Sequence, residues 1–83
     1  MPTIVILAVH DRQLAAYMRP FMAQTIGQGL RSFRDEVNRP DSELNKHPED
    51  YELHHIGHFN ERTGEVQGQK PQQIAIASNP IGS

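Results

Sequence analysis

The chain has 83 residues, with ten acidic and eight basic side chains, a net charge of −2 and no cysteine. A chain of this length forms one domain with a thin core, and the missing cysteines exclude disulfides and thiolate metal sites. No apolar run reaches the roughly 18–20 residues of a membrane helix, and the first residues do not resemble a signal peptide. We therefore expect a soluble domain that gains stability from a second copy.

Charge is distributed unevenly along the chain. Residues 12–39 hold five arginines against two carboxylates, a balance of +3, whereas residues 40–65 hold two basic against seven acidic side chains, a balance of −5. The basic region can face phosphate, or the two regions can face each other between subunits. The third interpretation is a set of charges dispersed over a solvated surface, and the net negative charge argues against a general nucleic-acid binder.

The first predicted element is a β-strand over Thr3–Val9, because this run is rich in β-branched residues. Its apolar character on both faces indicates a central strand. Ala16–Ala23 is expected to return beside it as an edge strand or a bulged strand, since Pro20 lacks the N–H that a sheet ladder requires. A helical turn around Gln13–Met18 is the competing interpretation.

A helix is predicted to begin after Thr25, which forms a capping-box pattern with Gln28. The apolar residues that follow are spaced by four, three and four positions and share one helical face: Ile26, Leu30, Phe33 and Val37. Asn38–Pro40 should end the helix. Gly27 and Gly29 each weaken a helix by roughly 1 kcal/mol relative to alanine, so we expect them where the helix lies close to the sheet.

The second half of the chain predicts a short helical turn over Asp41–Leu44 and then a strand over Tyr51–Phe59. Strict alternation divides this strand into two faces, one with Tyr51, Leu53, His55, Gly57 and Phe59 and the other with Glu52, His54, Ile56 and His58. Asn60–Gly64 is typical of a hairpin loop in which Gly64 adopts a positive φ, and the return strand starts at Glu65.

The order strand, strand, helix, strand, strand predicts an α+β fold, a small antiparallel sheet with one helix packed on one face. We assign residues 1–68 to this single domain. Residues 69–83 form a C-terminal tail containing Gln, Pro, Gly and Ser that is partly ordered at most. Within it, residues 74–77 are suited to a short strand or to docking on a partner, and the very end should be mobile.

Catalytic and metal-binding patterns are weak. No serine lies in a nucleophile elbow, and there is no Gly-rich phosphate loop with its lysine. His54 and His58 would share a strand face with roughly 13 Å between their Cα atoms, too far for one ion unless a partner chain contributes ligands. The simpler interpretation is a polar, solvent-facing strip. We therefore predict no enzyme, no catalytic residue, no cofactor and no metal site within the chain.

A nucleic-acid interface is better supported by the residues. Proteins that bind single strands use exposed aromatic rings on strands for base stacking, flanked by arginine or lysine for phosphates. The candidate nucleic-acid-binding residues are Tyr17, Arg19, Phe21, Arg31 and Arg34. The competing interpretation is that the few aromatic residues serve the core, which we expect of Phe33, Phe59 and Tyr51.

Several segments in a fixed order resemble a known family: Ala16–Phe21, Gly29–Phe33 with Asp35, His47–Leu53, and Ile56–Phe59 ending in Asn60–Gly64. The family is the small nonstructural protein of gokushovirus-type Microviridae, bacteriophages with single-stranded DNA genomes, and it is commonly labelled a phage DNA-binding protein. The resemblance covers roughly residues 3–67. It implies a protein of the host cytoplasm, absent from the mature virion, that acts in viral DNA replication or handles its single-stranded product.

Three functional hypotheses follow. The first is a dimeric protein that binds single-stranded DNA or assists replication, in which Arg19, Arg31 and Arg34 contact phosphate and Tyr17 or Phe21 stacks on bases. The second is a protein–protein interaction module, either a homodimer or a binder of a phage or host replication protein, without DNA contact. The third is a histidine metal site that bridges subunits.

Overall fold

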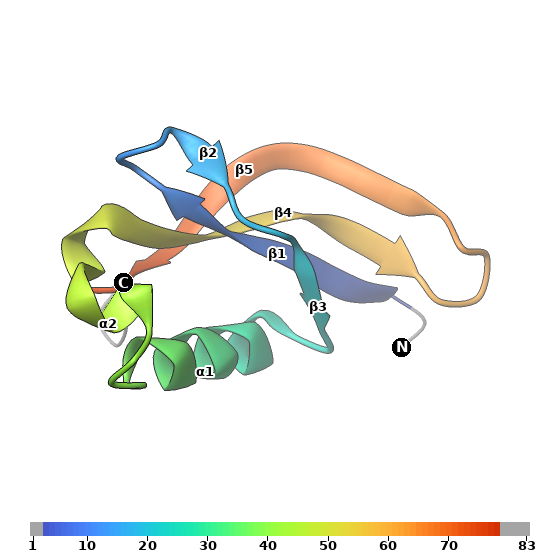
Figure 1. Ribbon diagram of the computed structural model, residues 1–83. Coiled ribbons are helices and arrows are strands. Elements are labelled where there is room, and N and C mark those ends of the chain that lie inside the picture. The colour runs from blue at the N-terminus through green and yellow to red at the C-terminus, as the bar shows by residue number, and fades with distance from the viewer. Residues whose placement is uncertain (1–2, 79–83) are drawn as a thin grey trace.

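Five strands and one main helix build the computed structural model, which describes residues 3–78 (Figure 1). The elements are β1 (Thr3–Asp11), β2 (Ala16–Tyr17), β3 (Phe21–Ala23), α1 (Ile26–Val37), α2 (Glu43–Lys46), the 3₁₀ turn η1 (Pro48–Asp50), β4 (Tyr51–Asn60) and β5 (Val66–Ile76). The strands form one antiparallel sheet in the order β2-β1-β4-β5, and β3 also pairs with β1. Helix α1 lies along one face of this sheet, which confirms the predicted α+β class.

Strand β1 is the central strand, as its apolar sequence predicted. β4 pairs with it from Thr3 to Asp11, while β2 and β3 pair with it as well and so must share its other edge. Ile4–Ala8 is buried throughout. The continuous apolar run therefore reflects burial on both faces of the sheet.

The sheet has an inner face, which α1 covers, and an outer face on the opposite side. Alternate residues of β1 divide between them, with Val5, Leu7 and Val9 on the inner face and Ile4, Ile6, Ala8 and His10 on the outer face. Residues directly opposite each other in an antiparallel pair share a face. The pairing register therefore places each side chain of β2, β3 and β4.

β2 and β3 are two parts of one interrupted edge strand, as predicted for the segment that contains Pro20. Tyr17 lies opposite His10, and Phe21 lies opposite Leu7. The four residue steps from Tyr17 to Phe21 therefore run beside only three steps on β1, from His10 to Leu7. One extra residue on one strand of a pair is a β-bulge. The competing helical turn does not form, because the chain turns at residues 12–15 and β2 begins directly afterwards.

Helix α1 begins as predicted. The Thr25 hydroxyl accepts a hydrogen bond from the backbone N–H of Gln28 at 3.1 Å. An ideal Cβ at Gly29 would lie 2.6 Å from Cδ1 of Leu7, so this glycine permits close packing on the sheet. A Cβ at Gly27 would contact only Thr25 Oγ1 at 3.7 Å, so the same explanation is wrong for that position.

The expected turn at Asp41–Leu44 is displaced by two residues and becomes α2. Ser42 caps it, because its hydroxyl accepts a hydrogen bond from the backbone N–H of Leu44 at 3.1 Å. Asn45 donates from its side-chain amide to the Val37 carbonyl at 2.8 Å and so ties α2 to the end of α1. Leu44 is thereby held over the inner face.

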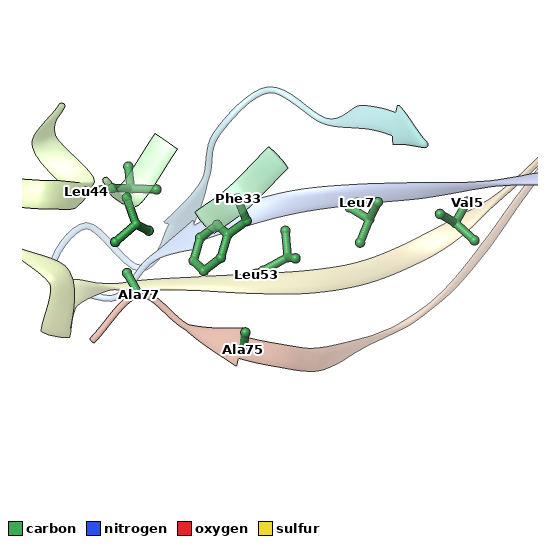
Figure 2. Close-up of a cluster of buried hydrophobic side chains, with 8 residues drawn as sticks. Val5, Leu7, Phe33, Leu44, Leu53, Ala75 and Ala77 are labelled. Atoms are coloured by element: carbon green, nitrogen blue, oxygen red, sulfur yellow. The ribbon is translucent and has the colours of Figure 1, made fainter. Parts of the chain in front are cut away.

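The core lies between α1, α2 and the inner face of the sheet. Figure 2 shows side chains from the strands and the helix converging there, and the buried cluster comprises Val5, Leu7, Phe33, Val37, Leu44, Leu53, Ala75 and Ala77. Phe33 and, at the margin, Tyr51 serve this core as expected. Phe59 lies opposite Ile4 and is half-buried on the outer face instead.

β4 contains a bulge at Ile56, and the strict alternation expected along this strand is wrong beyond it. His55 and Gly57 lie opposite Leu7 and Ile6, which are consecutive on β1, so Ile56 has no partner there. The extra residue moves every later side chain to the other face. The inner face receives Leu53, His55 and His58, and the outer face receives Glu52, His54 and Phe59.

β5 continues past the domain boundary expected at residue 68. Ala75 lies opposite Leu53 and is fully buried, and Ala77 is buried close by. The backbone N–H and C=O groups along the second edge of β4 require partners, which β5 supplies over its length. Residues 69–78 therefore belong to the sheet and the core rather than to a tail. The expected mobile end, residues 79–83, lies outside the described residues.

The hairpin between β4 and β5 is formed as predicted. Gly64 adopts φ 79° and donates its backbone N–H to the Asn60 carbonyl at 2.8 Å. The Asn60 side chain also accepts from the backbone N–H groups of Arg62 and Thr63. Within residues 3–78 the structure has no helix that is long and apolar enough to cross a membrane.

Candidate nucleic-acid interface and histidine cluster

Tyr17 is the one aromatic ring of the candidate interface that lies on the outer face. Its side chain is exposed, and its hydroxyl forms a hydrogen bond of 2.9 Å with Nδ1 of His54. The Tyr17 ring also lies 4.6 Å from the His10 ring, measured between centroids. The ring is therefore held in place on the sheet, as base stacking requires.

A compact polar cluster surrounds Tyr17 and consists of His10, Glu52 and His54, which together we call the histidine cluster. Nε2 of His54 lies 2.9 Å from Oε1 of Glu52, and Nδ1 of His10 lies 3.6 Å from the same oxygen. The two imidazole rings stack at 5.2 Å with 20° between their planes. Arg12 approaches the second oxygen of Glu52 at 3.6 Å.

Sheet register brings the histidine cluster together. His10 is on β1, opposite Glu52 on β4 and opposite Tyr17 on β2, and His54 lies two residues beyond Glu52 on the same face. Sequence reasoning missed this cluster because His10 precedes Glu52 by 42 residues in the chain. The alternation along the predicted strand did place Glu52 and His54 on one face. The sequence did not indicate that β1 pairs with β4, which is what brings His10 to them.

Phe21 faces the opposite side of the sheet from Tyr17. Its ring packs against the core cluster and lines a groove of about 470 Å³ between α1 and the Met18–Phe21 segment. The groove is mainly apolar, formed by Val9, Met18, Phe21, Phe33 and Leu44, with Arg19, Ser32 and Glu36 as its polar positions. Phe21 thus serves the core, and the candidate stacking residues do not form one surface.

The three candidate arginines lie around α1 and the sheet edge. Arg19 is exposed at the interruption between β2 and β3 and borders the groove, whereas Arg31 and Arg34 are on the helix. Ser32 borders the groove, and Arg34 points to the other flank because two residues turn a helix by about 200°. The structure therefore places Arg19 at the sheet edge and Arg31 and Arg34 on α1, and it does not gather them into a pocket.

Ion pairing separates the basic residues into two groups. Arg12, Arg39 and Lys46 lie within 4.0 Å of carboxylates. Among residues 3–78, the other basic side chains form no such pair: Arg19, Arg31, Arg34, Arg62 and Lys70. Three of the five are the candidate phosphate contacts.

The remaining histidines do not form the strip that the sequence suggested. His55 is buried, donates from Nε2 to the Gly57 carbonyl at 3.0 Å and accepts at Nδ1 from the Gln69 amide at 3.3 Å. The His58 ring packs on His55 at 4.8 Å. The bulge at Ile56 brings these two rings together and separates His58 from His54, so the expected shared face of His54 and His58 is wrong.

The surroundings of Tyr51 shift the pKa of its hydroxyl. Burial first, and then the negative charges of Asp11, Glu43 and Asp50, raise the pKa of its hydroxyl above the usual 10.0. Both causes disfavour the phenolate. Tyr51 is therefore a neutral, half-buried side chain at the margin of the core.

The outer face also has an apolar groove, of about 380 Å³, at the end distant from the histidine cluster. Ile6, Pro20, Met22, Ile56 and Val66 line it. Met22 and Val66 are 52% and 64% exposed, which is high for large apolar side chains.

The fold and these sites define a small antiparallel α+β protein with exposed arginines, an ordered surface tyrosine and two apolar grooves. The chain belongs to the phage ORF5 protein family, whose model matches residues 4–79. It is therefore a phage protein. No curated protein and no solved structure matches the chain.

Proposed function

We propose that this phage protein is a nonstructural, non-enzymatic protein of a gokushovirus-type member of the Microviridae that binds single-stranded DNA during viral DNA replication. It acts in the host cytoplasm and is not a component of the mature virion. Membership in the phage ORF5 family supports the phage origin. The sequence segments that resemble the nonstructural protein of gokushovirus-type Microviridae support the assignment to that group.

The observation that carries the proposal is the availability of Arg19, Arg31 and Arg34 in an acidic protein. Neighbouring carboxylates within residues 3–78 neutralise Arg12, Arg39 and Lys46 but not these three side chains. Phosphate contacts supply most of the affinity for single strands without sequence preference. Guanidinium groups free of protein carboxylates are suited to that role.

Tyr17 supplies the base-stacking part of the interface. It is exposed on the outer face, while Arg19 lies two residues further along at the sheet edge and Arg31 is on α1. In our proposal a strand of DNA crosses the edge from Tyr17 past Arg19 to the helix. Phe21 has no part in stacking, because its ring packs on the core.

The test is fluorescence anisotropy of a labelled single-stranded oligonucleotide, titrated with the protein at several salt concentrations. Three arginine–phosphate contacts predict a slope of about −2 for log K against log salt, at ~0.7 per contact. Arg31→Glu combined with Arg34→Glu should weaken binding by at least about tenfold.

Arg62→Glu combined with Lys70→Glu is the matched control, because both residues are exposed on the β4–β5 side and the net-charge change is the same. Equal losses in the two double variants would show nonspecific electrostatics. Absence of binding at tens of micromolar protein would contradict DNA binding.

A second candidate function is homodimerisation without DNA contact, and the outer-face groove favours it. Met22 and Val66 expose large apolar surface beside Ile56, and a chain of this size has a thin core that a second copy would extend. Light scattering across a concentration series should give the dimer mass, and Met22→Lys should give the monomer. A monomer at all concentrations would contradict this function.

A further inference from the structure

We propose that His10, Glu52 and His54 bind one divalent metal ion of the zinc type on the outer face. This inference goes beyond DNA binding and does not depend on it. Two imidazoles and one carboxylate are a donor set that zinc uses in proteins when a fourth position stays open. The ligand atoms of the three side chains all lie within 4.8 Å of one another.

The two oxygen–nitrogen distances in the histidine cluster are close to those around a tetrahedral ion. Donor atoms at 2.0–2.1 Å from a tetrahedral zinc ion lie roughly 3.3 Å apart. Oε1 of Glu52 lies 2.9 Å from Nε2 of His54 and 3.6 Å from Nδ1 of His10, one on each side of that value. An ion between these atoms requires only small side-chain movements.

Within the part of the chain that the structure describes, one ring nitrogen of His10 lacks the hydrogen bond that a buried polar atom normally makes. Nδ1 of His10 is buried and has no hydrogen-bond partner within residues 3–78. Its distance of 3.6 Å from Glu52 is too long for a hydrogen bond. A buried imidazole nitrogen without a hydrogen-bond partner is unfavourable, and a cation between this nitrogen and Glu52 would satisfy both groups.

The groups behind the ligands suit a metal site as well. Nδ1 of His54 and the Tyr17 hydroxyl are 2.9 Å apart, so a metal-bound His54 can donate its other N–H to the tyrosine oxygen. Arg12 lies 3.6 Å from Oε2 of Glu52 and leaves Oε1 for the ion. Tyr17 and Arg12 are thus positioning residues.

A second group of possible ligands serves as the comparison. His47, Glu49 and Asp50 also lie within reach of one ion, but His47 and Glu49 are exposed. By contrast, the side chains of Glu52 and His54 are 13% and 12% exposed. Partial burial strengthens the attraction between a carboxylate and a cation, so the histidine cluster should bind first.

Titration of the purified protein with Co²⁺, followed by its visible absorption, tests the proposal, and Zn²⁺ should displace the Co²⁺. We expect one ion per chain. His10→Gln and His54→Gln should each weaken binding at least a hundredfold, whereas His47→Gln should leave it unchanged. Far-UV circular dichroism of each variant checks the fold. Normal binding in both cluster variants, loss of binding in His47→Gln, or no binding by the wild type would overturn the proposal.

Two further measurements do not require removal of a ligand. Zn²⁺ should shift the ring NMR signals of His10 and His54 in the wild type and leave those of His47 unchanged. Tyr17→Phe keeps the ring but removes the hydroxyl behind His54, and should weaken binding roughly 10–100-fold. Signals that shift only at His47, or unchanged affinity in Tyr17→Phe together with unshifted His54 signals, would contradict the site.

Discussion

Tyr17 and Phe21 are four residues apart on the same edge of the sheet but lie on opposite faces. Tyr17 is opposite His10, and Phe21 is opposite Leu7, so the interruption at Pro20 adds one residue and reverses the alternation. In a regular strand both rings would share a face. The two aromatic residues therefore have separate roles, one at the surface and one at the core.

The first prediction separates these roles. Tyr17→Ala should weaken binding of single-stranded DNA by about 1–3 kcal/mol, because one stacking contact is lost. Phe21→Leu should leave DNA affinity unchanged and lower the free energy of unfolding by about 1 kcal/mol, since the ring packs on the core. Anisotropy and urea denaturation measure the two quantities. A larger loss of affinity in Phe21→Leu would place the stacking site on the inner face.

The second prediction compares the two helical glycines. Gly27→Ala should raise the free energy of unfolding by up to about 1 kcal/mol, because alanine favours the helix and the new Cβ meets only ordinary contacts. Gly29→Ala should lower it, because its Cβ would lie 2.6 Å from Cδ1 of Leu7, which is fully buried and cannot move away freely. Thermal unfolding of both variants measures this difference, and stabilisation by Gly29→Ala would show that α1 can withdraw from the sheet.

The third prediction concerns the part of β5 that was expected to be a tail. Ala75→Glu should destabilise the fold by roughly 3 kcal/mol or more, because it buries a carboxylate opposite Leu53. Gln72→Glu, on an exposed position of the same strand, is the matched control and should change stability little. Chemical denaturation gives both values. Equal stability of the two variants would mean that β5 separates from β4 in solution.

The fourth prediction is a loss of stability at alkaline pH. The pKa of Tyr51 is raised in the folded protein by burial and by nearby carboxylates. The unfolded chain therefore releases this proton first as the pH passes 10.0, and the free energy of unfolding falls through the folded-state pKa. Tyr51→Phe should remove this part of the pH dependence. Denaturation midpoints at pH 8 and above pH 10 measure it, and an unchanged slope in Tyr51→Phe would assign the effect to other groups.

Local patterns were sufficient for much of the fold. The capping of α1 by Thr25, the spacing that buries Phe33 and the positive φ of Gly64 each depend on a few neighbouring residues, and the structure contains them all. The bulge at Ile56 depends on how β4 pairs with β1, and no local signal specifies that register. The extent of β5 was missed for a related reason. Its exposed polar residues show no strand pattern in the sequence, and backbone pairing with β4 holds them in the sheet.

The candidate interface was harder to predict than the fold. Arg31 is exposed as the helical pattern indicated, but the opposite faces of Tyr17 and Phe21 follow from a single extra residue near Pro20. The histidine cluster depends on tertiary pairing alone. The predicted strand ended at Val9, before His10, and only the register of β1 shows that His10 meets His54.

The pairing of β1 with β4 also determines when the protein can fold during its synthesis. Asp11 and Tyr51, the nearest pair of these two strands in sequence, are 40 residues apart, and all other pairs are more distant. Such nonlocal contacts form late, because a long loop must close first. A nascent chain that ends at η1 contains α1 and the interrupted edge strand of β2 and β3, yet it leaves one side of Ile4–Ala8 without a partner. The ribosome must therefore release the chain through β4 before its most apolar strand is protected from aggregation.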